Sequence, residues 1–109
     1  MQYRRLGGSG LQVSTLGFGA MTFGASGVLE AYGRTEQAEA DRLIAVCLEA
    51  GVNLFDTAEG YSEGRSEEML GRALKGRCDQ VVLATKFVMS PGEGPNDAVV
   101  SAKGHLIAG

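Results

Sequence analysis

The sequence predicts an α/β fold in which a β-hairpin is followed by strands and helices that alternate along one small domain. Three short apolar runs, at residues 15–19, 52–55 and 81–85, are separated by longer segments with apolar residues at helical spacing. Strands that alternate with helices indicate a parallel sheet with right-handed crossovers. The runs are almost wholly apolar, which is typical of strands covered on both faces.

Composition excludes several classes of function. The chain has 109 residues, 44% of them hydrophobic, and a net charge of −3 with interspersed signs, which argues against nucleic acid as a partner. No run reaches the ~18 apolar residues of a membrane helix, so we expect no membrane partner. The N-terminus lacks the apolar core of a signal peptide. Cys47 and Cys78 stand apart from each other and from any Cys/His cluster. They predict neither a metal site nor a disulfide, and favour a reduced, cytoplasmic protein.

The first half of the chain predicts a hairpin, a strand, a loop and a helix. Residues 1–14 hold two short runs around a glycine-rich connection, which indicates a hairpin. Residues 15–19 form the first strand, and the glycine-rich segment 20–33 is expected to be a loop. Thr35 is a candidate N-cap for a helix that Gly51 ends.

The second half repeats the strand–helix order twice. Residues 52–55 are the second strand, Ser66 is the candidate N-cap of the next helix, and Gly76 ends that helix. Residues 81–85 are the third strand. A proline- and glycine-containing loop then leads to a last helix near residues 97–107, which the chain end cuts.

Two α/β architectures compete for this pattern. A dinucleotide-binding Rossmann unit needs Gly-x-Gly-x-x-Gly at an immediate helix start, but Thr22 stands at the third glycine position and no helix begins before about residue 35. A (β/α)₈ TIM barrel gathers its functional groups where strands end, and Asp56 and Lys86 both end apolar runs. Such a barrel needs about 250 residues. We therefore predict an incomplete barrel, in which residues 15–109 supply the first three strand–helix units and an open sheet edge favours self-association.

Asp56, Tyr61 and Lys86 are the candidate functional residues. If the second and third runs are neighbouring parallel strands, Asp56 and Lys86 emerge at the same end of the sheet, with Tyr61 on the loop above them. Taken singly, Asp56 could cap a turn, Lys86 could be a solvated charge and Tyr61 could be half-buried packing. Their occurrence together favours a catalytic site.

Several stretches of the sequence, spread along nearly the whole chain, resemble the aldo-keto reductase family. The resemblance implies a TIM barrel whose bottom is closed by the N-terminal hairpin, an NADP(H) cofactor, and reduction of a small aldehyde or ketone. The stretches that carry it are residues 3–7, 11–14, 16–24, 50–58, 66–74 and 84–86, together with Tyr61.

The resemblance also assigns roles to single residues. Asp56, Tyr61 and Lys86 match three members of the family's catalytic tetrad, with Tyr61 as the proton donor. The cofactor site would retain Asp56 and three residues after the first strand, which are Gly19, Ala20 and Met21. Ser62 follows Tyr61 where glycine is frequent in the family, a departure expected to alter only the loop.

The fourth catalytic member, a histidine that ends the family's fourth strand, falls beyond Gly109. His105 lies in the last helix pattern and cannot replace it. The resemblance therefore implies that the isolated chain turns over poorly or not at all. The alternative function is a non-catalytic fragment or a binding subunit of this fold, similar to potassium-channel β subunits. The joint presence of the three catalytic residues favours the oxidoreductase.

Overall fold

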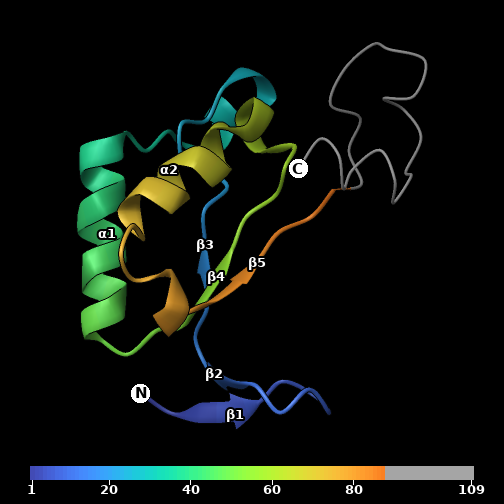
Figure 1. Ribbon diagram of the computed structural model, residues 1–109. Helices are drawn as coiled ribbons and strands as arrows, with labels where there is room; N and C mark the ends of the chain where they lie inside the picture. The colour runs from blue at the N-terminus through green and yellow to red at the C-terminus, as the bar shows by residue number, and fades with distance from the viewer. Residues whose placement is uncertain (88–109) are drawn as a thin grey trace.

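The computed structural model describes residues 1–87, which form a hairpin, a parallel sheet and two α-helices (Figure 1). The strands are β1 (Tyr3–Arg5), β2 (Gln12–Ser14), β3 (Phe18–Gly19), β4 (Leu54–Asp56) and β5 (Val82–Ala84). The α-helices are α1 (Gln37–Glu49) and α2 (Arg65–Ala73), and the 3₁₀ helices are η1 (Gly27–Tyr32), η2 (Tyr61–Gly64) and η3 (Cys78–Gln80). The helix expected near residues 97–107, and His105 within it, lie outside the described residues.

The sheet has the order β3-β4-β5, and all three strands are parallel. Its register aligns Phe55 with Leu83 and aligns Asp56 with Gly19 and Ala84. Parallel strands place their carboxyl ends at one edge, which lies at the top of the sheet in Figure 1. The predicted α/β class is confirmed, and the arrangement is that of a partial TIM barrel.

The antiparallel hairpin of β1 and β2 lies at the opposite end of the sheet, at the bottom of Figure 1. Asn53, just before β4, holds it in place. Its Oδ1 accepts a hydrogen bond from the Ser14 N–H at 2.7 Å, and its Nδ2 donates to the Gln12 carbonyl at 2.9 Å. The Tyr3 hydroxyl donates to the Gly51 carbonyl at 2.7 Å. These contacts keep the hairpin at the amino ends of the strands.

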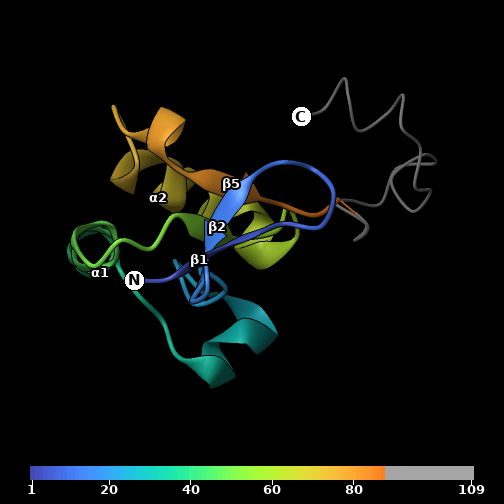
Figure 2. The ribbon, with the colours of Figure 1, turned by 90° about the horizontal axis from the view of Figure 1, so that it is seen from below.

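The hydrophobic core lies between the sheet and the two α-helices, which cover the same side of it (Figures 1 and 2). Phe55 is fully buried at the centre of this core. The helices contribute Ile44 from α1 and Leu70 from α2. Burying each such side chain stabilises the fold by about 1.5–3 kcal/mol. Leu83, on the edge strand β5, remains 49% exposed.

Three local predictions from the sequence were wrong. The N-cap position of α1 is Glu36, which makes no side-chain capping bond, whereas Thr35 forms a β-bridge with Phe23. Helix α2 begins after Gly64, so Ser66 lies inside its first turn and does not cap it. Residues 20–33, which were expected to be a loop, contain the 3₁₀ helix η1. This helix is too short to show the apolar periodicity that predicts an α-helix.

Candidate active site

The ammonium group of Lys86 is held by three oxygen acceptors at the carboxyl end of the sheet. Asp56, the last residue of β4, accepts at both carboxylate oxygens, each 2.9 Å from Lys86 Nζ. The carbonyl of Thr57 accepts at 2.7 Å. An ammonium has three hydrogens to donate, and here three acceptors surround it. The position of Lys86 is therefore defined even though its side chain is 48% exposed.

The pKa of Lys86 is raised above its ordinary value, chiefly by the hydrogen bond to Asp56. Partial loss of hydration opposes this effect, while the charge of Asp56 and the nearby Tyr61 phenol reinforce it. Because both partners of the Asp56–Lys86 ion pair are about half exposed, solvent screens their attraction. Lys86 is consequently a cation throughout the neutral range.

Tyr61 lies against this ammonium. It is the first residue of η2, and Lys86 Nζ is 5.2 Å from the centre of its ring. That separation falls within the range of cation–π attraction. The Tyr61 N–H donates to the Ala58 carbonyl at 3.1 Å and closes a turn. The structure thus brings together the three residues Asp56, Tyr61 and Lys86.

Backbone hydrogen bonds explain why the two loops meet. The chain after β4 continues to pair with the chain after β5: the Thr57 N–H donates to the Ala84 carbonyl, and the Glu59 N–H donates to the Lys86 carbonyl, both at 2.9 Å. The segment that carries Tyr61 is therefore tied to the segment that carries Lys86. The Tyr61 and Lys86 side chains lie close together because these hydrogen bonds hold the two backbone segments side by side.

The residues predicted to bind the cofactor differ in their burial and in the space beside them. Gly19 aligns with Asp56 across the sheet, and a Cβ added to Gly19 would meet no atom within 4 Å. This leaves room for a ligand beside Asp56. Ala20 is fully buried, and its N–H donates to the Asp56 carbonyl at 2.9 Å. Ala20 thus extends the pairing of β3 with β4 beyond Gly19, whereas Met21 is only half-buried.

Sequence reasoning missed a buried chain of hydroxyl groups under the site. The Ser66 hydroxyl donates to the Ala20 carbonyl at 2.6 Å, which uses its single hydrogen. The Thr57 hydroxyl, 2.8 Å away, must then donate to Ser66 Oγ. Both side chains are almost wholly buried. The pattern offered one signal, since Ser66 shares the apolar helix face of Met69, Leu70 and Ala73.

Comparison with known proteins agrees with this fold. The family model described as "Aldo/keto reductase family" matches residues 15–105. The chain belongs to this family. None of the helices within residues 1–87 is both long and apolar enough to cross a membrane.

Similar proteins include both reductases and channel subunits. An aldo-keto reductase from Bacillus halodurans, solved in its holo form, shares 41% identity with a TM-score of 0.64 over 78% of this chain and 25% of its own. Two proteins described as "Probable voltage-gated potassium channel subunit beta" match the whole chain, at 43% identity in Oryza sativa and 42% in Arabidopsis thaliana. The chain spans 31% of the length of each.

Proposed function

We propose that this chain carries the catalytic groups of an NADPH-dependent oxidoreductase that reduces small aldehydes and ketones to alcohols. The observation that carries the proposal is the position of Lys86, which bonds both oxygens of Asp56 and lies 5.2 Å from the centre of the Tyr61 ring. Three predicted catalytic groups from separate segments converge at one strand end. Family membership and the holo relative support the choice of a nicotinamide cofactor.

In this mechanism the bound NADPH would supply the hydride. Tyr61 would give its hydroxyl proton to the carbonyl oxygen of the substrate. The Lys86 ammonium would offset the negative charge that forms on the phenolate. Asp56 and the Thr57 carbonyl would keep that ammonium in place. The open space beside Gly19 would admit the cofactor next to Asp56.

We also propose that the 109-residue chain alone turns over poorly. Residues 1–87 contain no histidine, and the single histidine of the sequence, His105, is not assigned a catalytic role. Of the catalytic tetrad that the family resemblance implies, the described residues thus supply Asp56, Tyr61 and Lys86 but not the histidine. The 49% exposure of Leu83 on the edge strand β5 supports self-association, which light scattering would measure.

The test is the substitution Tyr61→Phe, which removes only the hydroxyl group. Made in a longer protein that completes the barrel, this variant should lose aldehyde-dependent consumption of NADPH and keep NADPH binding, which is followed by its fluorescence. Tyr32→Phe is the matched control, because Tyr32 is 69% exposed and lies on η1. Undiminished turnover in Tyr61→Phe would contradict the proposal that Tyr61 is the proton donor.

A second candidate function is a cytoplasmic, non-catalytic binding subunit. It is favoured by the potassium-channel β-subunit descriptions of the two plant relatives. In the same longer protein, NADPH binding without any aldehyde-dependent consumption would support this candidate. Turnover that depends on the Tyr61 hydroxyl would exclude it.

A further inference from the structure

The turn after Tyr61 contains three consecutive residues with left-handed backbone angles. Ser62 has φ 53° and ψ 45°, Glu63 has φ 58° and ψ 39°, and Gly64 has φ 87° and ψ −5°. Within residues 1–87, Ser62 and Glu63 are the only non-glycine residues with positive φ. A side chain disfavours these angles because its Cβ approaches the following carbonyl oxygen. Such strain persists where surrounding contacts hold it, and it clusters at functional sites.

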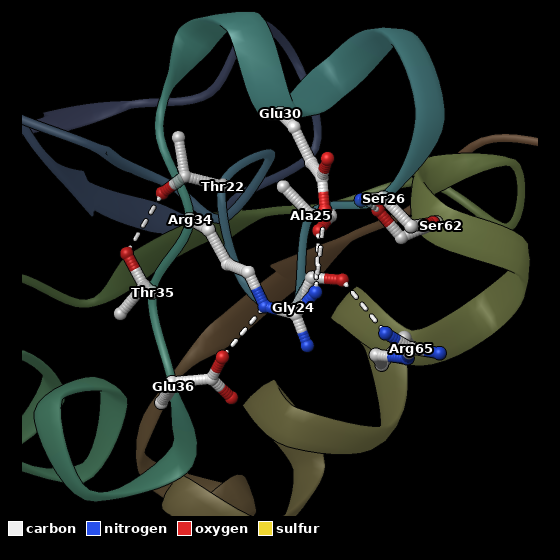
Figure 3. A network of polar contacts seen from close by, with 10 residues as sticks. All are labelled: Thr22, Gly24, Ala25, Ser26, Glu30, Arg34, Thr35, Glu36, Ser62 and Arg65. Atoms are coloured by element: carbon white, nitrogen blue, oxygen red, sulfur yellow. Dashed lines mark hydrogen bonds and ion pairs between the residues drawn. The ribbon is translucent and has the colours of Figure 1, made fainter.

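The side chain of Ser62 supplies a contact that holds this turn. Ser62 is only 6% exposed, and its Oγ accepts a hydrogen bond from the Ser26 N–H at 3.1 Å. Figure 3 shows the two residues facing each other from separate segments. Ser26 directly precedes η1, which lies beside η2 above the sheet (Figure 1). The hydroxyl of Ser62 therefore joins the Tyr61 turn to the segment 22–36.

The segment 22–36 is itself fixed by polar contacts within residues 34–36 and between them and residues 22–25 (Figure 3). A guanidinium group, paired threonine hydroxyls and backbone groups make these contacts on both sides of Ser26. The bonded atoms are Gly24 N with Thr35 O (2.8 Å), Thr22 Oγ1 with Thr35 Oγ1 (3.1 Å), Arg34 Nη1 with Ala25 O (3.3 Å) and Arg34 Nε with Glu36 Oε1 (2.6 Å). The Ser26 N–H that bonds to Ser62 therefore belongs to a segment that its own hydrogen bonds hold in place.

We propose that Ser62 is a positioning residue for Tyr61. Its hydroxyl ties the left-handed turn to the segment 22–36 and so keeps the Tyr61 ring against the Lys86 ammonium. On the other side, the Tyr61 N–H is bonded to the Ala58 carbonyl, so the chain is fixed before and after the tyrosine. A glycine would reach the same backbone angles without strain, but it would lack the oxygen that accepts from Ser26. The inference rests on the catalytic role proposed for Tyr61.

Two substitutions separate the hydroxyl from the backbone. Ser62→Gly removes the hydroxyl and relieves the strain, so the variant should unfold at the same temperature as the parent chain or higher. Ser62→Ala removes the hydroxyl and keeps the strain, so it should unfold at a lower temperature. Ser9→Gly is the matched control, because the Ser9 hydroxyl bonds only within its own exposed hairpin turn, to the Leu6 carbonyl and the Leu11 N–H.

The readout is the NMR signal of the Tyr61 ring in the full 109-residue chain, with ¹³C-labelled tyrosine. The sequence has three tyrosines and no tryptophan, so Tyr61→Phe assigns the signal directly. Lys86→Met, made in each background, gives the change in chemical shift that the ammonium causes. We expect this change to be unaltered in Ser9→Gly and to fall by more than half in Ser62→Gly and Ser62→Ala. Amide exchange at Ser26 should be at least tenfold faster in both Ser62 variants.

Three results would overturn the proposal. The first is a Lys86-dependent change in the Tyr61 chemical shift that is as large in Ser62→Gly as in the parent chain. The hydroxyl would then be dispensable, whatever Ser62→Ala shows. The second is unchanged exchange at Ser26 in Ser62→Gly. The third is the absence of any Lys86-dependent change in the parent chain. Because these signals need neither cofactor nor substrate, a missing reductase activity would contradict only the proposed function and leave this inference standing.

Discussion

Replacing Ser66 by alanine tests the buried hydroxyl chain beneath the site. The substitution removes the hydrogen bonds to the Ala20 carbonyl and from the Thr57 hydroxyl. Ala20 keeps a partner, because its carbonyl also accepts from the Phe23 N–H at 3.0 Å. The Thr57 hydroxyl is left in a site that is 2% exposed. A lost hydrogen bond costs about 1 kcal/mol, and an unsatisfied buried hydroxyl costs about 1–3 kcal/mol.

We therefore expect Ser66→Ala to lower the free energy of unfolding by about 2–4 kcal/mol. For a domain of this size that corresponds to a fall in Tm on the order of 10 °C. The assay is urea and thermal unfolding followed by far-ultraviolet circular dichroism. Ser9→Ala, at an exposed position, is the control and should change stability by less than about 0.5 kcal/mol.

A double substitution tests whether the Thr57 and Ser66 hydroxyls interact. Thr57→Val removes the hydroxyl that Ser66→Ala would leave unsatisfied, at almost constant volume. Replacing both partners of a buried hydrogen bond by apolar groups is much less costly than removing one. The double variant should thus lose less stability than the two single losses added together, by about 1 kcal/mol. Strict additivity, or a cost below about 0.5 kcal/mol for Ser66→Ala alone, would refute the hydroxyl chain.

Two further predictions concern a glycine and the ion pair. Gly24→Ala should cost about 1–3 kcal/mol more than Gly27→Ala in urea unfolding. Both glycines have φ near +60°, but only a Cβ at Gly24 would meet other side chains, with Arg65 Cγ at 2.7 Å and Met69 Sδ at 2.8 Å. Equal costs would contradict this packing. The raised pKa of Lys86 means that its stabilising contact with Asp56 is present below about pH 10.4 and is lost as the pH rises through the higher folded-state pKa. The stability difference between the parent chain and Asp56→Asn should accordingly shrink in strongly alkaline solution, and a difference that grows would be the opposite of what we expect.

The order of elements and the positions of the three catalytic candidates could be read from the sequence. Apolar spacing and short apolar runs are local signals, and they placed α1, α2 and the three parallel strands within a few residues of their observed bounds. Asp56 and Lys86 were recognised because a polar residue that ends an apolar run marks a strand end. Parallel pairing then required both to emerge at one edge of the sheet.

Only the tertiary structure decided how these groups are held. Ser66 carries the sequence signature of an N-cap, yet its hydroxyl bonds instead to Ala20, just after β3, and to Thr57, just after β4. The third acceptor of Lys86 is a backbone carbonyl, that of Thr57, which no side-chain pattern reveals. Ser62 adopts left-handed angles that its residue type disfavours, and the N–H of Ser26, 36 positions earlier, donates to its hydroxyl. Local spacing determines where helices and strands form, whereas these contacts join segments distant in sequence and exist only once the chain has folded.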